Sequence, residues 1–106
     1  MPRNSIKVLI VYQAQPGRAS DGLSALSTLV ATVVAEEPAC LGITIHQDVA
    51  DPTRILLDEE WTDQASYVGP HMQTPHIRAF IQTAPELFAG PPEISFWEPR
   101  VEERRG

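Results

Sequence analysis

The chain has 106 residues, of which 42% are apolar and 21% charged, a composition typical of one folded domain. Its net charge is −6, and its basic clusters, Arg3 with Lys7 and the arginines of residues 100–105, are small or interleaved with glutamates. This balance argues against nucleic acid as a partner, because phosphates require a cationic surface.

A single cysteine, Cys40, excludes an internal disulfide and any metal site built from several cysteines. No apolar stretch approaches the roughly 18–20 residues of a membrane span, and residues 1–4 lead into a strand-like segment without a cleavage-site pattern. The sequence therefore predicts a cytoplasmic protein with no membrane partner. One domain is expected over residues 1–106, with a core at about residues 5–99 and a charged tail at residues 100–106.

The first half of the chain predicts a strand, a helix and a second strand. Residues 5–13 are rich in β-branched and apolar side chains and precede the turn signal Pro16-Gly17. A helix is expected to begin at a cap formed by Ser20 or Asp21 and to end before Pro38. Residues 40–47 then alternate in polarity as a strand does. The predicted apolar face of the helix contains Leu23, Leu26, Val30, Val33 and Val34.

The second half predicts a strand at residues 54–62, a short helical segment at 63–67 and a last strand at 93–98. Before the last strand, Thr74 can cap a helix whose first position is Pro75, where the missing N–H costs nothing. Pro85 is expected to close this helix. Its predicted buried stripe contains Ile77, Phe80, Ile81 and Ala84.

The order βαββαβ predicts an α+β, ferredoxin-like fold: a four-stranded antiparallel sheet with helices on one face. Residues 8–11 and 55–57 are apolar throughout, so each strand would place apolar side chains on both faces of the sheet. Two helices can cover only one of these faces. The second face therefore needs a cover. We expect a second copy of the chain to provide it, giving a homodimer joined through the sheet faces.

Several short motifs occur in order along most of the chain. They are EPACLG at residues 37–42, DP at 51–52, EEW at 59–61 and HMQTPH at 71–76. Together they resemble the antibiotic biosynthesis monooxygenase family, which typically reads E-P-G-C, then E-x-W, then a histidine followed by T-P-H or S-P-H. The resemblance implies a dimeric α/β barrel and, in characterised members, oxygen insertion into hydroquinones or polyketide phenols without metal or flavin.

The chain departs from the family pattern at several positions. Ala39 stands where glycine is usual, and the segment between Trp61 and His71 is one residue longer than is common. Leu57 occupies the place of an asparagine that polyketide-oxidising members have four residues before the tryptophan, whereas the spacing between Trp61 and Tyr67 is kept. The asparagine, tryptophan and histidine set of the haem-degrading branch is not reproduced, so haem is not expected. No nucleotide, phosphate-loop or zinc-protease motif is present, and the sequence predicts no cofactor.

His71 and His76 are the first candidates for catalysis, because histidine exchanges protons near neutral pH. Either could instead be structural and lock the turn between the two helical segments. A metal site is disfavoured, because the two histidines lie five residues apart across a proline and no third ligand is evident. His46 is expected at the surface or at an interface.

Leu57, Glu59 and Trp61 share a parity and should point to the same side of their strand. If that side is the helix-covered one, Trp61 offers a wall for an aromatic substrate, and Glu59 becomes a carboxyl group with raised pKa and base character. Core packing of Trp61 and an ion pair of Glu59 across the dimer are the alternatives. Tyr67 could bind a substrate oxygen or anchor the short helix, and Phe80 could complete the apolar wall.

Three functions remain open on the sequence alone. The first is a cofactor-independent monooxygenase that acts on dioxygen and a small aromatic, quinol or polyketide-like substrate. The second is an isomerase or tautomerase of a small metabolite, and the third is a module that only binds a small apolar ligand. Dioxygen consumption separates the first from the others, and proton exchange into substrate separates the second from the third.

Overall fold

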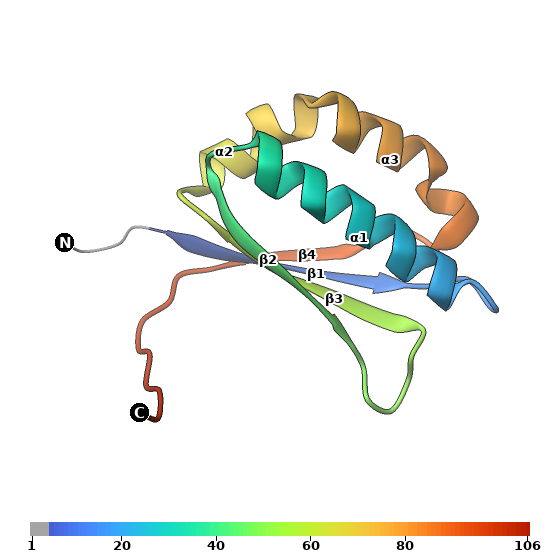
Figure 1. Cartoon of the computed structure of the whole chain (residues 1–106), viewed down its shortest axis with the longest axis horizontal. Helices are drawn as coiled ribbons and strands as arrows, with labels where there is room; N and C mark the ends of the chain where they lie inside the picture. Colours follow the sequence, from blue (N-terminus) through green and yellow to red (C-terminus); the bar gives the residue numbers. More distant parts are fainter. Residues whose placement is uncertain (1–4) are drawn as a thin grey trace.

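The computed structural model describes residues 5–106, which form a four-stranded antiparallel sheet with helices on one face (Figure 1). The strand order is β2-β3-β1-β4. This confirms the predicted ferredoxin-like α+β fold. The elements are β1 (Ile6–Gln13), α1 (Ala19–Glu36), β2 (Cys40–Gln47), β3 (Arg54–Trp61), α2 (Gln64–Val68), the 3₁₀ helix η1 (Pro70–Gln73), α3 (Pro75–Leu87) and β4 (Glu93–Trp97).

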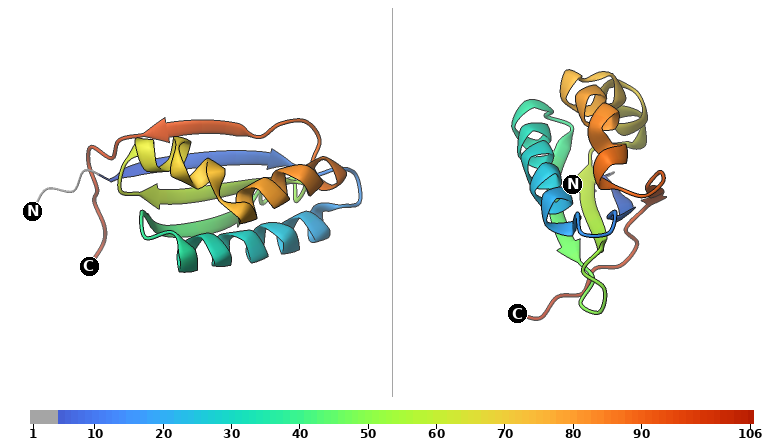
Figure 2. Two further views of the ribbon diagram at one scale, coloured as in Figure 1. Left: turned by 90° about the horizontal axis from the view of Figure 1, so that it is seen from above. Right: turned by 90° about the vertical axis from the view of Figure 1, so that its right-hand side faces the viewer.

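The register of the two central strands decides which side chains face the helices. Ile6 lies opposite Trp61, and Ile10 lies opposite Leu57 on β3 and Ile94 on β4. Side chains alternate between the faces of a sheet, so every second residue of each strand is buried beneath α1 and α3. Figure 2 shows these two helices side by side over the same face.

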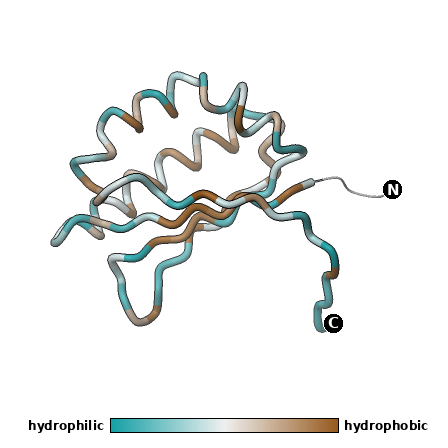
Figure 3. The backbone as a smooth tube through the Cα atoms, turned by 180° about the vertical axis from the view of Figure 1, so that it is seen from behind, coloured by the Kyte–Doolittle hydropathy of each residue, from teal (hydrophilic) through white to brown (hydrophobic). Residues whose placement is uncertain are grey.

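The core lies between that face and the helices. It is built mainly from alternate residues of β1 and β3, with Leu26, Leu29 and Val33 from α1 and Ile77 from α3. Figure 3 shows the same pattern as apolar stretches along the middle of the sheet. Val34 and Ile81, which were predicted to be buried, are exposed instead. Val34 follows the buried Val33 and lies on the outward side of α1, whereas Ile81 borders the cavity described below rather than the packed core.

Helix α1 begins earlier than predicted. Ala19 is its first residue and Arg18 its N-cap, so Ser20 and Asp21 lie in the first turn rather than at the cap. Arg18 pairs with Asp21 at 3.0 Å across this turn. The helix can start at once because Gly17 ends the preceding turn with a φ of 74°, a conformation that glycine adopts without strain.

The bounds of β2 are as predicted, and the remaining elements differ from prediction by one or two residues at one end or both. Pro85 does not close α3 but lies inside it. Proline has no N–H, so the helix lacks a hydrogen bond at residue 85. It nevertheless continues to Leu87, because the N–H of Phe88 bonds to the carbonyl of Ala84 at 2.8 Å. Residues 98–106, including the predicted charged tail, are exposed and have no regular structure. Arg3 belongs to residues 1–4 and lies outside the described residues.

The opposite face of the sheet is covered by no element of residues 5–106. We call it the open face, and it carries Lys7, Leu9, Val11, His46, Leu56, Asp58 and Trp97. Lys7 bonds to Asp58 at 3.1 Å, and His46 lies 3.7 Å from the same carboxylate. Leu9, Val11 and Leu56 are only half-buried. Within the described range, none of the helices is both long and apolar enough to cross a membrane.

Candidate active site

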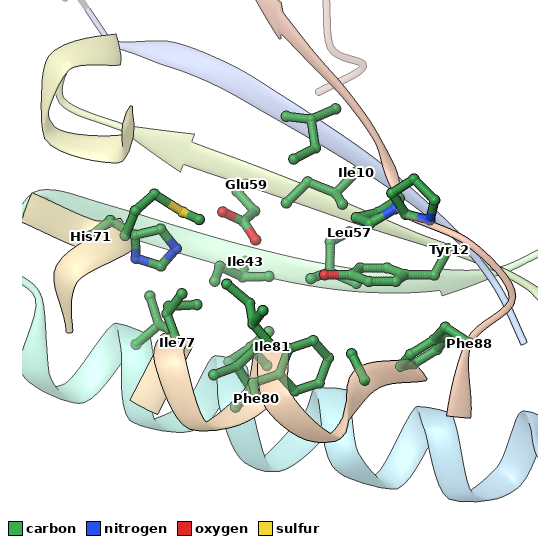
Figure 4. Close-up of a pocket in the computed structure, with 18 of the residues that line it drawn as sticks. Ile10, Tyr12, Ile43, Leu57, Glu59, His71, Ile77, Phe80, Ile81 and Phe88 are labelled. Atoms are coloured by element: carbon green, nitrogen blue, oxygen red, sulfur yellow. The ribbon is translucent and has the colours of Figure 1, made fainter. Parts of the chain in front are cut away.

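A cavity of about 560 Å³ lies between the sheet and the two long helices. Its wall is formed mostly by apolar side chains from all four strands, from α1, η1 and α3, and from the segment that precedes β4. These include Ile10, Leu29, Val30, Val33, Ile43, Leu57, Met72, Ile77, Phe80, Ile81, Ala84, Phe88, Pro91, Pro92 and Ile94. Figure 4 shows His71 and Glu59 toward one end of the cavity, and Tyr12 and Phe88 toward the other.

Four side chains give the cavity its polar groups: Tyr12, Glu59, Tyr67 and His71. No lysine or arginine is among the described residues that line it. An anionic ligand would therefore lose its hydration without gaining a cationic partner. The wall suits a neutral molecule that is largely apolar and has few hydrogen-bonding groups.

Glu59 lies on β3 between Leu57 and Trp61 and is only 3% exposed. The indole N–H of Trp61 donates to its Oε1 at 2.8 Å. Burial raises the pKa of Glu59 to about 7, with the charges of Glu37 and Asp58 acting in the same direction and the bond from Trp61 opposing them. Near neutral pH this carboxyl group therefore exists in both its protonated and its ionised form.

His71 lies in η1, and its ring packs against two aromatic rings. The centroid distances are 4.6 Å to Trp61 and 4.9 Å to Tyr67. Its Nδ1 lies 2.9 and 3.0 Å from the two carboxylate oxygens of Glu37. Burial lowers the pKa of His71 although Glu37 partly opposes this, so the ring is neutral at pH 7 and able to accept a proton.

His76 lies in the first turn of α3 but does not line the cavity. Its Nε2 contacts Oε2 of Glu37 at 2.6 Å. The structure thus brings His71 and His76 together through a residue to which the sequence reasoning gave no role. Glu37 belongs to the EPACLG motif, which was the one signal that could have found it, because 34 and 39 residues separate it from the histidines.

The remaining predicted site residues divide between the cavity wall and the layer behind it. Leu57, Tyr67 and Phe80 line the cavity. Trp61 lies outside the lining and is 1% exposed, packed edge-on against Tyr67 at a centroid distance of 5.5 Å. It contacts the cavity through Glu59 and His71, which it holds in place, rather than as a flat wall.

Tyr12 was not predicted as a site residue. It lies on β1 at the same parity as Val8 and Ile10, and its ring contacts those of Phe80 and Phe88 at centroid distances of 6.2 and 4.7 Å. Burial raises the pKa of both Tyr12 and Tyr67, so each hydroxyl stays protonated and can donate a hydrogen bond. Within residues 5–106, no group of three His, Cys, Asp or Glu side chains is arranged to hold a metal ion.

The sequence profile of the antibiotic biosynthesis monooxygenase family matches residues 5–83. The chain belongs to this family. The match extends from the start of β1 into α3 and includes Glu37, Glu59, His71 and His76. The cavity described above is therefore built largely from the part of the chain that defines an antibiotic biosynthesis monooxygenase domain.

Solved structures show how widely this fold recurs. PA3566 from Pseudomonas aeruginosa is 26% identical, with a TM-score of 0.82 over 92% of this chain and 96% of that one. A conserved protein from Methanosarcina mazei Go1 is 20% identical, with a TM-score of 0.80 over 92% and 94% of the two chains. An antibiotic biosynthesis monooxygenase that is 22% identical has a TM-score of 0.78 over 91% and 99%.

A curated relative, the uncharacterized protein sll1783 of Synechocystis sp., is 31% identical over 62 residues. The matched region covers 58% of this chain and 42% of that protein. The chain thus spans less than half the length of this relative.

Proposed function

We propose that the chain is a monooxygenase that adds one atom of dioxygen to a neutral, electron-rich phenol or hydroquinone and needs no cofactor. The observation that carries the proposal is the arrangement of two acid–base groups, His71 and Glu59, at one end of an apolar cavity. The family description supports the reaction type. The cavity volume, about 560 Å³, is in the range of sites for small organic ligands.

The protein's first task is to remove a proton. Neutral His71 takes it from the phenolic hydroxyl, and the resulting phenolate passes one electron to dioxygen. Recombination of the two radicals forms a carbon–oxygen bond and hence a peroxide. Because the apolar wall excludes water, the phenolate and the radical pair are protected from competing reactions.

The second task is to return a proton. Protonated His71 first returns its proton to the peroxide and gives a hydroperoxide. Protonated Glu59 then gives its proton to the distal oxygen, which leaves as water, while the carbon that bears the hydroperoxide becomes a carbonyl and loses its hydrogen as a proton that re-protonates Glu59. The substrate carbon supplies all four electrons that dioxygen receives. One oxygen atom enters the product, the other becomes water, and no external reductant is required.

An isomerase acting on a small neutral metabolite is the second candidate. The same two groups favour it, because a base and an acid on one cavity can move a proton between two atoms of a substrate without dioxygen. The absence of a cationic side chain from the described lining makes a phosphorylated metabolite a poor fit for either reaction.

Oxygen uptake by the purified chain tests the proposal. Quinols, polyphenols and anthrone-type phenols are supplied one at a time with no added metal or flavin and with a chelator present. We expect one dioxygen consumed per substrate and one labelled oxygen atom in the product when ¹⁸O₂ is used. Uptake that depends on a flavin, haem or metal purified with the protein would contradict the cofactor-free reaction.

The same panel distinguishes the alternatives. Deuterium exchange from solvent into a substrate carbon without oxygen uptake would support the isomerase. Binding without exchange or uptake would support a ligand-binding module. Glu36→Gln, a change at an exposed residue of α1 that does not line the cavity, is the matched control for each assay.

A further inference from the structure

Glu37 is a carboxylate placed between two histidines. It is the residue at the C-terminal cap of α1, where its N–H bonds to the carbonyl of Val33 at 2.9 Å. From there its side chain, which is 12% exposed, reaches His71 in η1 and His76 at the start of α3. Three helical elements thus meet at one carboxylate, which is held from both sides.

The contact between Glu37 and His71 decides where the histidine keeps its proton. A carboxylate only accepts hydrogen bonds, so Nδ1 of His71 must carry the hydrogen. In a neutral imidazole the other nitrogen, Nε2, then has the free lone pair. Both oxygens of Glu37 lie within 3.0 Å of Nδ1, which makes the opposite tautomer unfavourable.

Nε2 of His71 faces the cavity. It has no hydrogen-bond partner within residues 5–106, and no enclosed side-chain nitrogen or oxygen in that range lacks one. Nε2 must therefore reach free space, and the free space beside His71 is the cavity (Figure 4). Trp61 and Tyr67 pack against the ring and prevent it from turning this nitrogen away.

We propose that Glu37 is the positioning residue of this site: it fixes His71 in the Nδ1–H tautomer and so presents the basic Nε2 to the cavity. His76 acts through Glu37, because its contact at 2.6 Å holds the carboxylate in line with His71. The catalytic consequence rests on the proposed function, whereas the tautomer does not.

Glu37 also assists when His71 takes up a proton. The imidazolium that forms would be costly in a buried site, and the carboxylate behind it offsets that cost. The other ionisable groups near the ring are His76, Glu59 and Tyr67, of which His76 opposes the positive charge. Replacing Glu37 by glutamine removes the favourable charge and leaves an amide that can bond to Nδ1 as donor or acceptor.

Nitrogen NMR of the full chain tests the tautomer without any substrate. Histidine-labelled protein is studied at pH 8, and the His71 signals are assigned from their loss in His71→Gln. We expect a protonated Nδ1 and a bare Nε2 in the wild type, and a mixture or the reverse tautomer in Glu37→Gln. Glu36→Gln is the matched control, because it removes the same charge from the exposed neighbouring residue.

A bare Nδ1 in the wild type, or the same tautomer in the wild type and Glu37→Gln, would overturn the proposal. If Glu37→Gln does not fold, the wild-type spectrum still decides. Once a substrate is found, Glu37→Gln should lower turnover by about tenfold to a hundredfold, less than the roughly 10²–10⁴-fold expected for loss of the base itself, with KM changed little. Normal turnover in a variant with an altered tautomer would refute the positioning role, whereas inactivity of every variant and the wild type alike would count only against the proposed reaction.

Discussion

Glu59 sits where a carboxylate is least stable, on the helix-covered face of β3 among apolar side chains. Its raised pKa of about 7, against an ordinary value of 4.5, ties the stability of the fold to pH. The protonated form is the one favoured in the folded state. The stability that protonated Glu59 contributes to the fold is therefore fully present below about pH 4.5 and is lost as pH rises through 7.

Glu59→Gln should remove this pH dependence. Glutamine keeps an oxygen for the indole N–H of Trp61 but never ionises, so the variant should gain stability relative to the wild type between pH 5 and pH 8. The expected difference is at most about 3 kcal/mol. Urea unfolding at both pH values and at one protein concentration measures it, with Glu36→Gln as control. If the stability of the wild type and that of Glu59→Gln changed equally with pH, Glu59 would have an ordinary pKa.

His71 is predicted to be the general base. Because its ring is enclosed by Trp61 and Tyr67, alanine would leave a void and lower stability for reasons unrelated to catalysis. His71→Gln is the better variant, and it should reduce turnover by roughly 10²–10⁴-fold while the protein stays folded. Steady-state rates and melting temperature are measured on the same sample. A lower melting temperature with turnover unchanged would assign His71 a structural role only.

At the scale of elements, sequence periodicity predicted the strands well. Alternation in β1 and β3 is a local property, and it placed Leu57, Glu59 and Trp61 on a shared face. The predicted start of α1 was wrong, because a polar residue in the first turn of a helix cannot be told in the sequence from one at the N-cap. The hydrogen-bonded cluster of Glu37, His71 and His76 could not be predicted from spacing, since α1, η1 and α3 meet there only in three dimensions.

Thr74 joins two of these elements. It is the N-cap of α3, where its Oγ1 accepts from the N–H of Ile77 at 3.4 Å, and it donates to the carbonyl of His71 at 2.9 Å. Thr74→Ala should lower the free energy of unfolding by about 1 kcal/mol, as loss of a cap usually does. Thr74→Ser keeps the hydroxyl and serves as control in urea unfolding. A loss below about 0.5 kcal/mol, the size of an ordinary surface change, would show that the cap contributes little.

At the scale of the whole molecule, the two faces of the sheet differ in character. The helix-covered face is apolar apart from the groups of the cavity. The open face mixes half-buried Leu9, Val11 and Leu56 with the Lys7–Asp58 ion pair and with Trp97, which is 56% exposed. A mixture of an apolar centre with a few fixed charges is what a specific protein interface contains.

We predict that a second copy of the chain covers the open face. Leu9 lies on the central strand β1, opposite Asp58 on β3 and Ser95 on β4, so it marks the middle of the expected contact. Leu9→Lys would bury an ammonium group there and should give monomeric or insoluble protein. Val34→Lys makes the same kind of change on the exposed side of α1 and should leave assembly intact. Sedimentation velocity at micromolar concentration decides between outcomes: a monomeric wild type would refute the dimer, and a dimeric Leu9→Lys would place its interface away from the sheet.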